Sequence, residues 1–307
     1  MPAATEILYA LGAGDDLAGV SDDCTYPPEA RAKPTASTSR LPDDLTSAQI
    51  DAAAGDLHRA GSVYHIDRDF LRAAHPDLII AQDVCEVCAV SSAEARAAAD
   101  DALCAAPVVS VSAGSLAGIL DSVEELGHHC GREDQARHLR SSMQEQLAEV
   151  ANACGALPRT RAFYIGWLEP LMCEGHWVPE LIAVAGGQEV IGRTGEYGVP
   201  VEWQAVVDAA PEVIIVAPCS FDVPRTLREV DLLETLPDWR ELDAVGSRRV
   251  FVADSAYFAC PGPRIVDGAR ILARALHPDA WRSPAPEGAM AVIAPGPHGR
   301  SQWIPYR

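Results

Sequence analysis

Four of the nine cysteines follow short apolar runs of the kind that form β-strands. They are Cys24, Cys85, Cys88 and Cys219. Cys85 and Cys88 form a C-x-x-C pair, and loops at the carboxyl ends of parallel strands are where α/β proteins bind ligands. A thiolate-rich set favours zinc or an iron–sulfur cluster over calcium or magnesium. Three interpretations stay open: metal or cluster ligands, a redox dithiol, and small apolar side chains packed at loop bases.

Three further residues have side chains suited to ligand contact. His176 precedes a helix in GHWVPE, where its imidazole is either a metal ligand or a helix-start histidine bonded to backbone. Glu86, between the paired cysteines, is either a ligand or base or a solvated loop carboxylate. Arg264 follows Pro263 at a helix start, where it either anchors a phosphate or carboxylate or forms a surface ion pair.

Aromatic residues also gather in the expected strand-end loops, where they either line a ligand groove or pack in the ordinary way. Large flat ligands need such stacking surfaces. The aromatic residues in these loops are Tyr26, Trp167, Trp177, Phe221, Tyr257 and Phe258.

The segments that carry these residues occur twice. AAHPDLIIAQDVC (73–85) recurs as DAAPEVIIVAPC (208–219), with Pro76 and Pro211 in matching positions. Each copy has a helix end, a proline, an acidic residue and a four-residue apolar run, which is typical of a buried strand in a parallel sheet. PAATEILYALGAGDDLAGV near the start likewise resembles WVPELIAVAGGQEVIGR. The duplication predicts two similar lobes with a ligand groove between them.

The length of 307 residues also favours two lobes. We expect an α/β fold with an N-terminal lobe over 1–130, a connecting helix over 131–155, a C-terminal lobe over 156–280 and a loosely packed tail over 281–307. Expected helices cover 5–11, 46–57, 67–74, 93–103, 116–126, 132–152, 179–185, 203–209 and 263–276. Expected strands cover 17–21, 77–81, 108–111, 161–166, 212–217 and 249–253, and 22–40 is expected to be loop.

Charge and hydropathy exclude several classes of protein. The net charge is −20 and Lys33 is the one lysine, so no basic stripe is present to bind nucleic acid. No apolar run approaches the roughly 20 residues that span a bilayer, so a membrane-embedded protein is not expected. Met1 leads directly into a helical segment. As written, the sequence predicts a cytoplasmic protein with reduced thiols, or a periplasmic or otherwise extracytoplasmic one if the true start lies upstream.

Motifs of common enzyme classes are missing from the sequence. It contains no G-x-G-x-x-G, no P-loop, no H-E-x-x-H and no G-x-S-x-G. No residue is therefore assigned a catalytic role, and a binding protein is favoured over an enzyme.

Several segments together resemble the cobalamin-binding and siderophore-binding proteins of ABC importers, a periplasmic binding protein family with a rigid helical connector. The matching segments, which cover about residues 1–277, are PAATEILYALG, the Tyr26–Pro27–Pro28 loop, HPDLIIA, the long helix, GHWVPELIAVAGG, APEVIIVAP and PGPRIVDGARIL.

The resemblance implies two α/β lobes that hold a corrinoid such as cobalamin, or a related metal chelate, and close by a small hinge motion. It also implies an ABC permease as partner, contacted through one glutamate on each lobe. Glu94 is the counterpart in the first lobe. In the second lobe the nearest match is Gln204, with Glu202 two residues away.

Two functions follow as hypotheses. The first is a binding protein for a small-molecule metal chelate, with aromatic stacking and with His176 or a cysteine at the metal. The second is a cytosolic metalloprotein or enzyme on the same fold, with a cysteine-bound zinc or iron–sulfur cluster in the groove.

Overall fold

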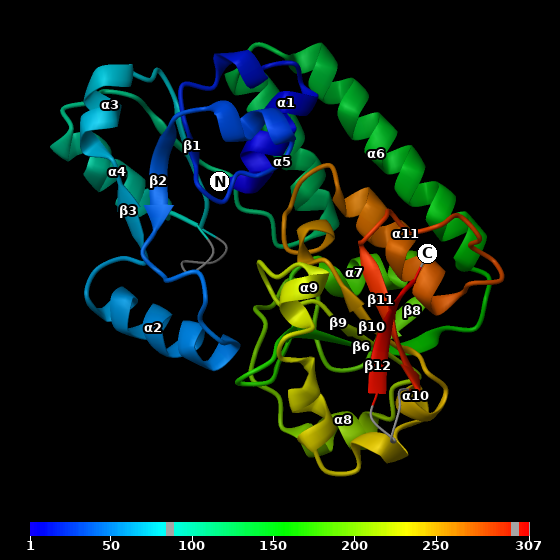
Figure 1. Ribbon diagram of the computed structural model, residues 1–307. Coiled ribbons are helices and arrows are strands. Elements are labelled where there is room, and N and C mark those ends of the chain that lie inside the picture. The colour runs from blue at the N-terminus through cyan, green and yellow to red at the C-terminus, as the bar shows by residue number, and fades with distance from the viewer. Residues whose placement is uncertain (84–88, 296–300, 307) are drawn as a thin grey trace. The chain divides into compact units, whose positions relative to one another are not determined.

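The protein folds into two compact units (Figure 1). The structure is a computed structural model that describes residues 1–83, 89–295 and 301–306. Unit 1 comprises Met1–Ala113 and Ala117–Ser142, and unit 2 comprises Gly114–Leu116 and Met143–Arg307. The chain passes from unit 1 to unit 2 within α6 (Glu133–Cys154), a single 22-residue helix. At 1.5 Å per residue this helix is about 33 Å long.

Unit 1 contains two separate small sheets. In the first, β1 (Val20–Ser21) pairs in parallel with β2 (Thr35–Ser39), and β2 pairs antiparallel with β3 (Tyr64–Ile66). In the second, β4 (Ile79–Ala81) pairs in parallel with β5 (Val108–Ser110). Strands β1 and β4 are therefore both edge strands.

Several helices of unit 1 begin at polar caps that the sequence encodes. The helices of this unit are α1 (Pro2–Ala10), α2 (Ser47–Arg59), α3 (Arg68–Ala74), α4 (Ser92–Asp101) and α5 (Leu116–His129), whose first residue belongs to unit 2. Thr46 and Gln49 form a capping box at α2, and Ser91 and Glu94 form another at α4. Such a box satisfies two backbone N–H groups that would otherwise lack partners.

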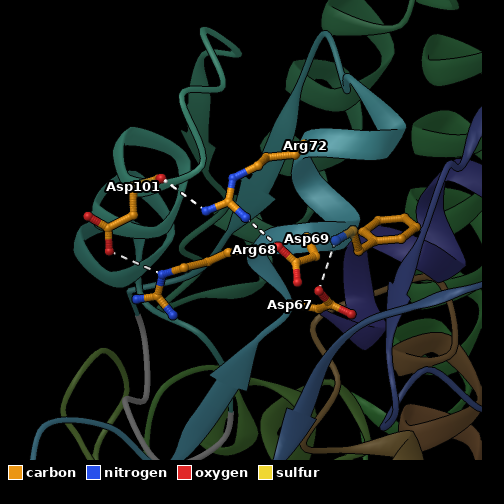
Figure 2. A network of polar contacts seen from close by, with 6 residues as sticks. Asp67, Arg68, Asp69, Arg72 and Asp101 are labelled. Carbon is orange, nitrogen blue, oxygen red and sulfur yellow. Dashed lines mark hydrogen bonds and ion pairs between the residues drawn. The ribbon is translucent and has the colours of Figure 1, made fainter.

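Polar contacts cap α3 and connect it to α4 (Figure 2). The Asp67 carboxylate caps α3 by accepting from the Phe70 N–H at 2.8 Å. Arg68 Nε donates to Asp101 Oδ2 at 3.1 Å, and Arg72 reaches both Asp69 and the Asp101 carbonyl. These groups are solvent-exposed, so each pair adds only about 0–1 kcal/mol.

Unit 2 contains one seven-stranded mixed sheet. Its parallel strands lie in the order β8 (Gly187–Glu189), β6 (Thr160–Trp167), β9 (Val213–Val216) and β10 (Val250–Ala253). Strand β7 (Met172–Cys173) runs antiparallel to β6. The apolar run of β9 is fully enclosed, with Val213, Ile214 and Val216 at 0% exposure, as expected for a strand with a neighbour on each edge and helices over its faces.

Short helices connect the strands of unit 2. They are α7 (Val178–Val184), α8 (Trp203–Ala209), α9 (Val223–Thr226), α10 (Asp243–Gly246) and α11 (Ile265–Leu276). The longest of them, α11, buries nine of its twelve residues. Helix α7 contacts both α11 and β8.

The expectation of a loosely packed tail is wrong for much of the C-terminal segment. Strand β11 (Met290–Pro295) pairs antiparallel with β10, and β12 (Ser301–Pro305) pairs antiparallel with β11. The apolar run before Pro295 is short and rich in alanine, so the sequence carries little periodic signal there. The strand forms because β10 offers a non-local edge at which it pairs.

Strands β2, β3, β7 and β8 are also absent from the sequence-based expectation. Strand β2 lies inside 22–40, which we expected to be loop. The segment, TASTS, has no apolar face. Its extended conformation therefore comes from pairing with β1 and β3, and not from its own composition.

Candidate ligand-binding site

The carboxyl ends of three adjacent parallel strands in unit 2 gather several of the predicted site residues. Trp167 ends β6, Cys219 and Phe221 follow β9, and Tyr257 lies in a short turn that follows β10. Because β6, β9 and β10 are parallel neighbours, their carboxyl ends lie on one edge of the sheet. The strands expected at 161–166, 212–217 and 249–253 thus bring these residues to one edge of the sheet.

Trp167 and Phe221 are in contact at this edge. Their ring centroids are 5.2 Å apart and tilted by 48°. The indole N–H of Trp167 donates to the Glu169 carbonyl at 3.1 Å, and Trp167 remains half-buried. Phe221 is only 5% exposed, so it supports Trp167 from below and offers little surface of its own.

Arg225 completes this aromatic group and was missed by the sequence reasoning. Its guanidinium carbon lies 4.1 Å from the centroid of Phe221, a cation–π contact. Its Nη1 also pairs with Glu229 Oε1 at 2.5 Å, one helical turn further on. An Arg–x–x–x–Glu spacing after a strand-end aromatic residue was the available signal.

Arg264 and Tyr257 form a second cation–aromatic pair after β10. The guanidinium carbon of Arg264 is 5.6 Å from the Tyr257 ring centroid, and Arg264 is the N-cap residue of α11. Both side chains are half-buried. The neighbouring Phe258 is fully buried against Tyr164, so it belongs to the core and not to the site surface.

Trp177 is a packing residue in this structure. It is 5% exposed, and its indole N–H donates to the Phe258 carbonyl at 2.7 Å. The indole N–H is the one hydrogen-bond donor of a tryptophan side chain, and a bond to a buried carbonyl keeps the ring inside the protein. Trp177 therefore supports the site from below and does not present a stacking face.

His176 is held rigidly by a neighbouring loop. Its backbone has a left-handed φ of 50°, its N–H donates to the Glu196 carbonyl at 2.8 Å, and its carbonyl accepts from the Gly195 N–H at 2.9 Å. Its Nδ1 lies 3.4 Å from Glu174 Oε1, and its ring meets Tyr197 edge-on with centroids 5.1 Å apart. Tyr197 is 64% exposed and was also missed by the sequence reasoning.

Three glycines allow the segment around His176 to approach this loop closely. A Cβ at Gly175 would lie 2.1 Å from the Glu196 carbonyl oxygen, and one at Gly192 would lie 1.9 Å from the Glu174 carbonyl oxygen. At Gly198 the corresponding distance to the Cys173 carbonyl oxygen is 2.6 Å. The backbone of 173–175 thus packs directly against that of 192–198, and this contact holds the segment before His176 in place.

Glu189 anchors the start of the same loop. Its Oε1 accepts from the N–H groups of Ile191 at 3.0 Å and Gly192 at 3.1 Å, and its Oε2 accepts from the Tyr164 N–H at 3.0 Å. Burial raises the pKa of Glu189 to about 7, even though these three N–H donors act in the opposite direction. The sequence reasoning gave no role to this carboxylate.

In unit 1, the residues predicted after β1 divide between surface and core. Tyr26 is 45% exposed, as a stacking residue requires. Cys24 is 2% exposed, with its Sγ 3.1 Å from Thr5 Oγ1 and 3.2 Å from Ser21 Oγ. Cys24 thus packs against hydroxyl groups beneath the loop, which is the plain packing role of a buried thiol.

The structure lends no support to a cysteine cluster. Cys85, Glu86 and Cys88 lie outside the described residues. Cys219 is half-buried, with its Sγ 3.8 Å from Ser220 Oγ, and the seven described cysteines form no disulfide with one another. Within the described part of the chain, histidine, cysteine, aspartate and glutamate side chains nowhere gather in threes that could hold a metal ion.

The two glutamates expected to contact a permease differ in their surroundings. The Glu94 carboxylate accepts from the Ser91 N–H at 2.9 Å and from the Ser91 hydroxyl at 2.8 Å, so it is engaged in capping α4. Glu202 is exposed at the N-cap of α8, and Gln204 donates to Asp208 at 2.8 Å. Among the residues described, none of the helices combines the length and apolar character needed to cross a bilayer.

Comparisons with known proteins agree with this architecture. The family model described as periplasmic binding protein matches residues 1–257. An uncharacterized ABC transporter substrate-binding lipoprotein, YvrC of Bacillus subtilis, is 24% identical over 290 residues, which are 92% of this chain and 80% of the relative. The vitamin B12-binding protein of Vibrio parahaemolyticus is 22% identical over 269 residues, covering 87% of this chain and 83% of the relative.

A solved structure with the same fold is the periplasmic heme-binding protein RhuT from Roseiflexus sp. RS-1. It superimposes with a TM-score of 0.68 at 19% identity, over 91% of this chain and 96% of that one. The resemblance inferred from the segments of the sequence is thus confirmed, and the chain belongs to the periplasmic binding protein family.

Proposed function

We propose that this protein is the substrate-binding component of an ABC importer and that its ligand is a metal chelate with a large flat ring, a corrinoid such as cobalamin or a haem. Membership of the periplasmic binding protein family supports the first part. The vitamin B12-binding and heme-binding relatives support the second.

The observation that carries the proposal is the combination of aromatic surface and imidazole at the strand ends of unit 2. Trp167 and Tyr257 offer half-buried rings. Arg264 places positive charge beside Tyr257, and Arg225 lies over Phe221, on which Trp167 rests. Flat macrocycles bind to such rings, and their carboxylate or phosphate side groups pair with guanidinium. Binding of this kind requires no bond to be broken. Tyr26 of unit 1 is the corresponding exposed ring after β1.

His176 is the residue suited to contact the metal of the chelate. When its Nδ1 donates to Glu174 Oε1, 3.4 Å away, Nε2 keeps its lone pair and can act as an axial ligand. A carboxylate that holds the second ring nitrogen is the usual support for a metal-binding histidine. The positive φ and the glycine contacts keep the imidazole in place before the ligand arrives.

An importer component also requires a permease and a location outside the cytoplasmic membrane. Glu202 is the better docking candidate because its carboxylate is exposed, whereas that of Glu94 is engaged in the α4 cap. Glu202→Lys is expected to weaken binding to the permease in lipid vesicles, and Glu234→Lys serves as a control because Glu234 already pairs with Arg240. Equal binding by both variants and the wild type would remove Glu202 from this role.

Spectroscopic titration tests the ligand. Aquocobalamin and haemin are each added to the purified protein, to His176→Ala and to His138→Ala, whose histidine is exposed on α6. We expect a shift of the visible bands with the wild type and with His138→Ala, and at least a tenfold weaker response with His176→Ala. If the wild type binds neither compound, a flat metal chelate is not the ligand. If His176→Ala shifts the bands as the wild type does, the imidazole does not bind the metal.

Metal analysis separates this function from the cysteine-based alternative. A protein that only carries a chelate is expected to be colourless and free of stoichiometric zinc or iron when purified anaerobically. Stoichiometric zinc or iron that is lost in Cys85→Ser would contradict the proposal.

A further inference from the structure

Unit 2 contains a hollow beside strand β8, apart from the candidate ligand-binding site. The hollow has a volume of about 470 Å³ and is lined by β8, by one side of α7, by Arg159 and by the start of the loop after β8. Among the described strands, β8 pairs with β6 and with no other, and the β6 residues that pair with it do not line the hollow. The hollow therefore lies on the free side of β8. Trp167, His176 and Tyr257 of the candidate site do not line it either.

The free side of β8 offers backbone N–H groups. Thr160 N–H donates to the Gly186 carbonyl at 3.3 Å, and Val190 N–H donates to a β6 carbonyl at 3.0 Å, so these two β8-side residues face β6. Because the peptide groups of a strand alternate in direction, the N–H groups of Gly187 and Glu189 point to the other side, where the hollow lies. N–H groups at the edge of a sheet carry partial positive charge and favour an anion.

Arg159 places a guanidinium in the same hollow. Its Nη1 donates to the Ala183 carbonyl at 2.5 Å and to the Gly187 carbonyl at 3.2 Å. These bonds tie the guanidinium to the end of α7 and to β8, and they occupy only one of its nitrogens. The N–H groups of Nε and Nη2 remain for a ligand, and a guanidinium binds two oxygens of a phosphate or carboxylate group through such a pair.

Arg193 and Thr194 supply a second cation and a hydroxyl group. Arg193 Nη1 lies 3.9 Å from Glu196 Oε1, which is too far for a hydrogen bond, and the two side chains are 76% and 65% exposed. Such a pair contributes about 0–1 kcal/mol, so it does not hold Arg193 away from a ligand. Among the described residues, Glu189 is the only carboxylate that lines the hollow, and three backbone N–H groups already engage it.

The loop that carries Arg193 and Thr194 also holds His176. Thr194 is the parallel bridge partner of His176, and the Gly195 N–H donates to the His176 carbonyl at 2.9 Å. A ligand bound to the side chains of Arg193 and Thr194 therefore restrains the backbone on which His176 rests. Two sites that share one loop in this way are coupled in their binding free energies.

We propose that this hollow is a second ligand site, which binds the phosphate group of a small molecule and thereby steadies the loop that holds His176. The phosphate oxygens accept from Arg159, from Arg193 and from the N–H groups on the free side of β8, and Thr194 donates its hydroxyl. A phosphate group suits these donors better than a carboxylate because it offers more acceptor oxygens, pointing in more directions. The hollow is larger than one phosphate group and leaves room for the rest of the molecule.

Titration with inorganic phosphate tests the site, with chloride at equal ionic strength as the reference anion. The proteins are the wild type, Arg193→Ala and Arg137→Ala. Arg137 is the matched control because it is 66% exposed and also lies three residues from its acidic partner, Asp134. Calorimetry measures Kd, and hydrogen–deuterium exchange reports on residues 187–196, with β10 as the reference strand. NMR follows the ring signals of His176, which are assigned by their absence from His176→Ala.

We expect saturable binding of phosphate by the wild type and by Arg137→Ala, and a Kd about fivefold or more higher for Arg193→Ala. Exchange in 187–196 is expected to slow roughly threefold or more, with β10 unchanged and with a shift of the His176 ring signals. No chelate is added, so this experiment succeeds or fails independently of the proposed chelate binding.

Three results would contradict the proposal. The first is a response to phosphate no larger than the response to chloride, or equal affinity of Arg193→Ala and the wild type. The second is binding that leaves both the exchange of 187–196 and the His176 signals unchanged, because the loop would then not be steadied. The third is protection of β8 that appears only together with a dimer, because a second copy would then occupy its free side.

Vesicles that contain phosphatidic acid distinguish a free small molecule from a lipid headgroup as the source of the phosphate. We expect the wild type and Arg193→Ala to sediment equally little with them. Sedimentation of the wild type that is lost in Arg193→Ala would assign the hollow to a lipid headgroup and would contradict a small-molecule ligand.

Discussion

His75 and Ala210 occupy the same left-handed position 135 residues apart. His75 ends α3 with a φ of 45° and a ψ of 54°, and Ala210 ends α8 with a φ of 43° and a ψ of 64°. Each precedes a proline and an apolar strand. Neither residue is a glycine, although the left-handed region costs an L-residue roughly 1–2 kcal/mol. The repeat thus preserves a strained helix end in both units.

Replacing Ala210 by glycine is expected to stabilise the protein. Glycine adopts this conformation without the Cβ penalty, and its greater freedom in the unfolded chain offsets part of the gain, so we expect an increase of about 0.5–1 kcal/mol. The exposed Ala205, in the middle of α8, is the matched control, because glycine there should cost about 1 kcal/mol. Urea unfolding of the three proteins measures both changes. A loss of stability in Ala210→Gly would show that the left-handed cap is not strained.

The sequence predicted the repeat because its signals are local. A helix end, a proline and an apolar run lie within a dozen residues around Pro76 and again around Pro211, so α3, β4, α8 and β9 were placed within about two residues of their observed bounds. Strands such as β2 and β11 depend on partners that lie some distance away in the chain, β3 and β10, which local patterns do not report. The same limit explains why the C-terminal hairpin was expected to be a tail.

The site residues likewise fall into those whose position the sequence could predict and those whose position it could not. Trp167, Phe221, Tyr257 and Arg264 follow strands whose ends the sequence defines, so their shared edge could be predicted. Contacts between loops could not, because Tyr197 becomes a neighbour of His176 only through tertiary packing. Burial was equally hidden for Trp177 and Cys24, since both lie in segments with loop composition.

Gly192→Ala is expected to damage both stability and the position of His176. The new Cβ would lie 1.9 Å from the Glu174 carbonyl oxygen, so the backbone must shift, at a cost of about 1–3 kcal/mol. Gly246→Ala is the control, because its Cβ would meet nothing within 4 Å and alanine favours the helix end there. Thermal unfolding measures stability, and the histidine ring signals in an NMR spectrum report His176. Unchanged values in Gly192→Ala would contradict the tight contact between the two segments.

Trp167→Ala is expected to weaken ligand binding without unfolding unit 2. The half-buried ring rests on Phe221 with centroids 5.2 Å apart, and loss of one stacking surface costs about 1 kcal/mol or somewhat more, hence roughly a five- to tenfold rise in Kd. Trp167→Phe keeps a flat ring and should retain most of the affinity. Kd is measured by titration with the chelate that binds the wild type. If both variants bind as the wild type does, this edge of the sheet is not the ligand surface.

Glu189 is expected to make the stability of the protein fall as the pH rises from about 4.5 to about 7. Burial raises the pKa of this carboxyl from its ordinary value of 4.5 to about 7, so over that interval the folded state binds a proton that the unfolded state has already released. The slope of the unfolding free energy with pH is then negative, and the total loss approaches about 3 kcal/mol, since each pKa unit corresponds to about 1.4 kcal/mol. Glu189→Gln removes the titration, although its amide faces the Tyr164 N–H and lowers stability at every pH. Urea unfolding at several pH values should therefore give a less negative slope for Glu189→Gln than for the wild type. Parallel curves would show that the carboxylate titrates normally in the folded protein and that the loop from Ile191 onward is held independently of its protonation.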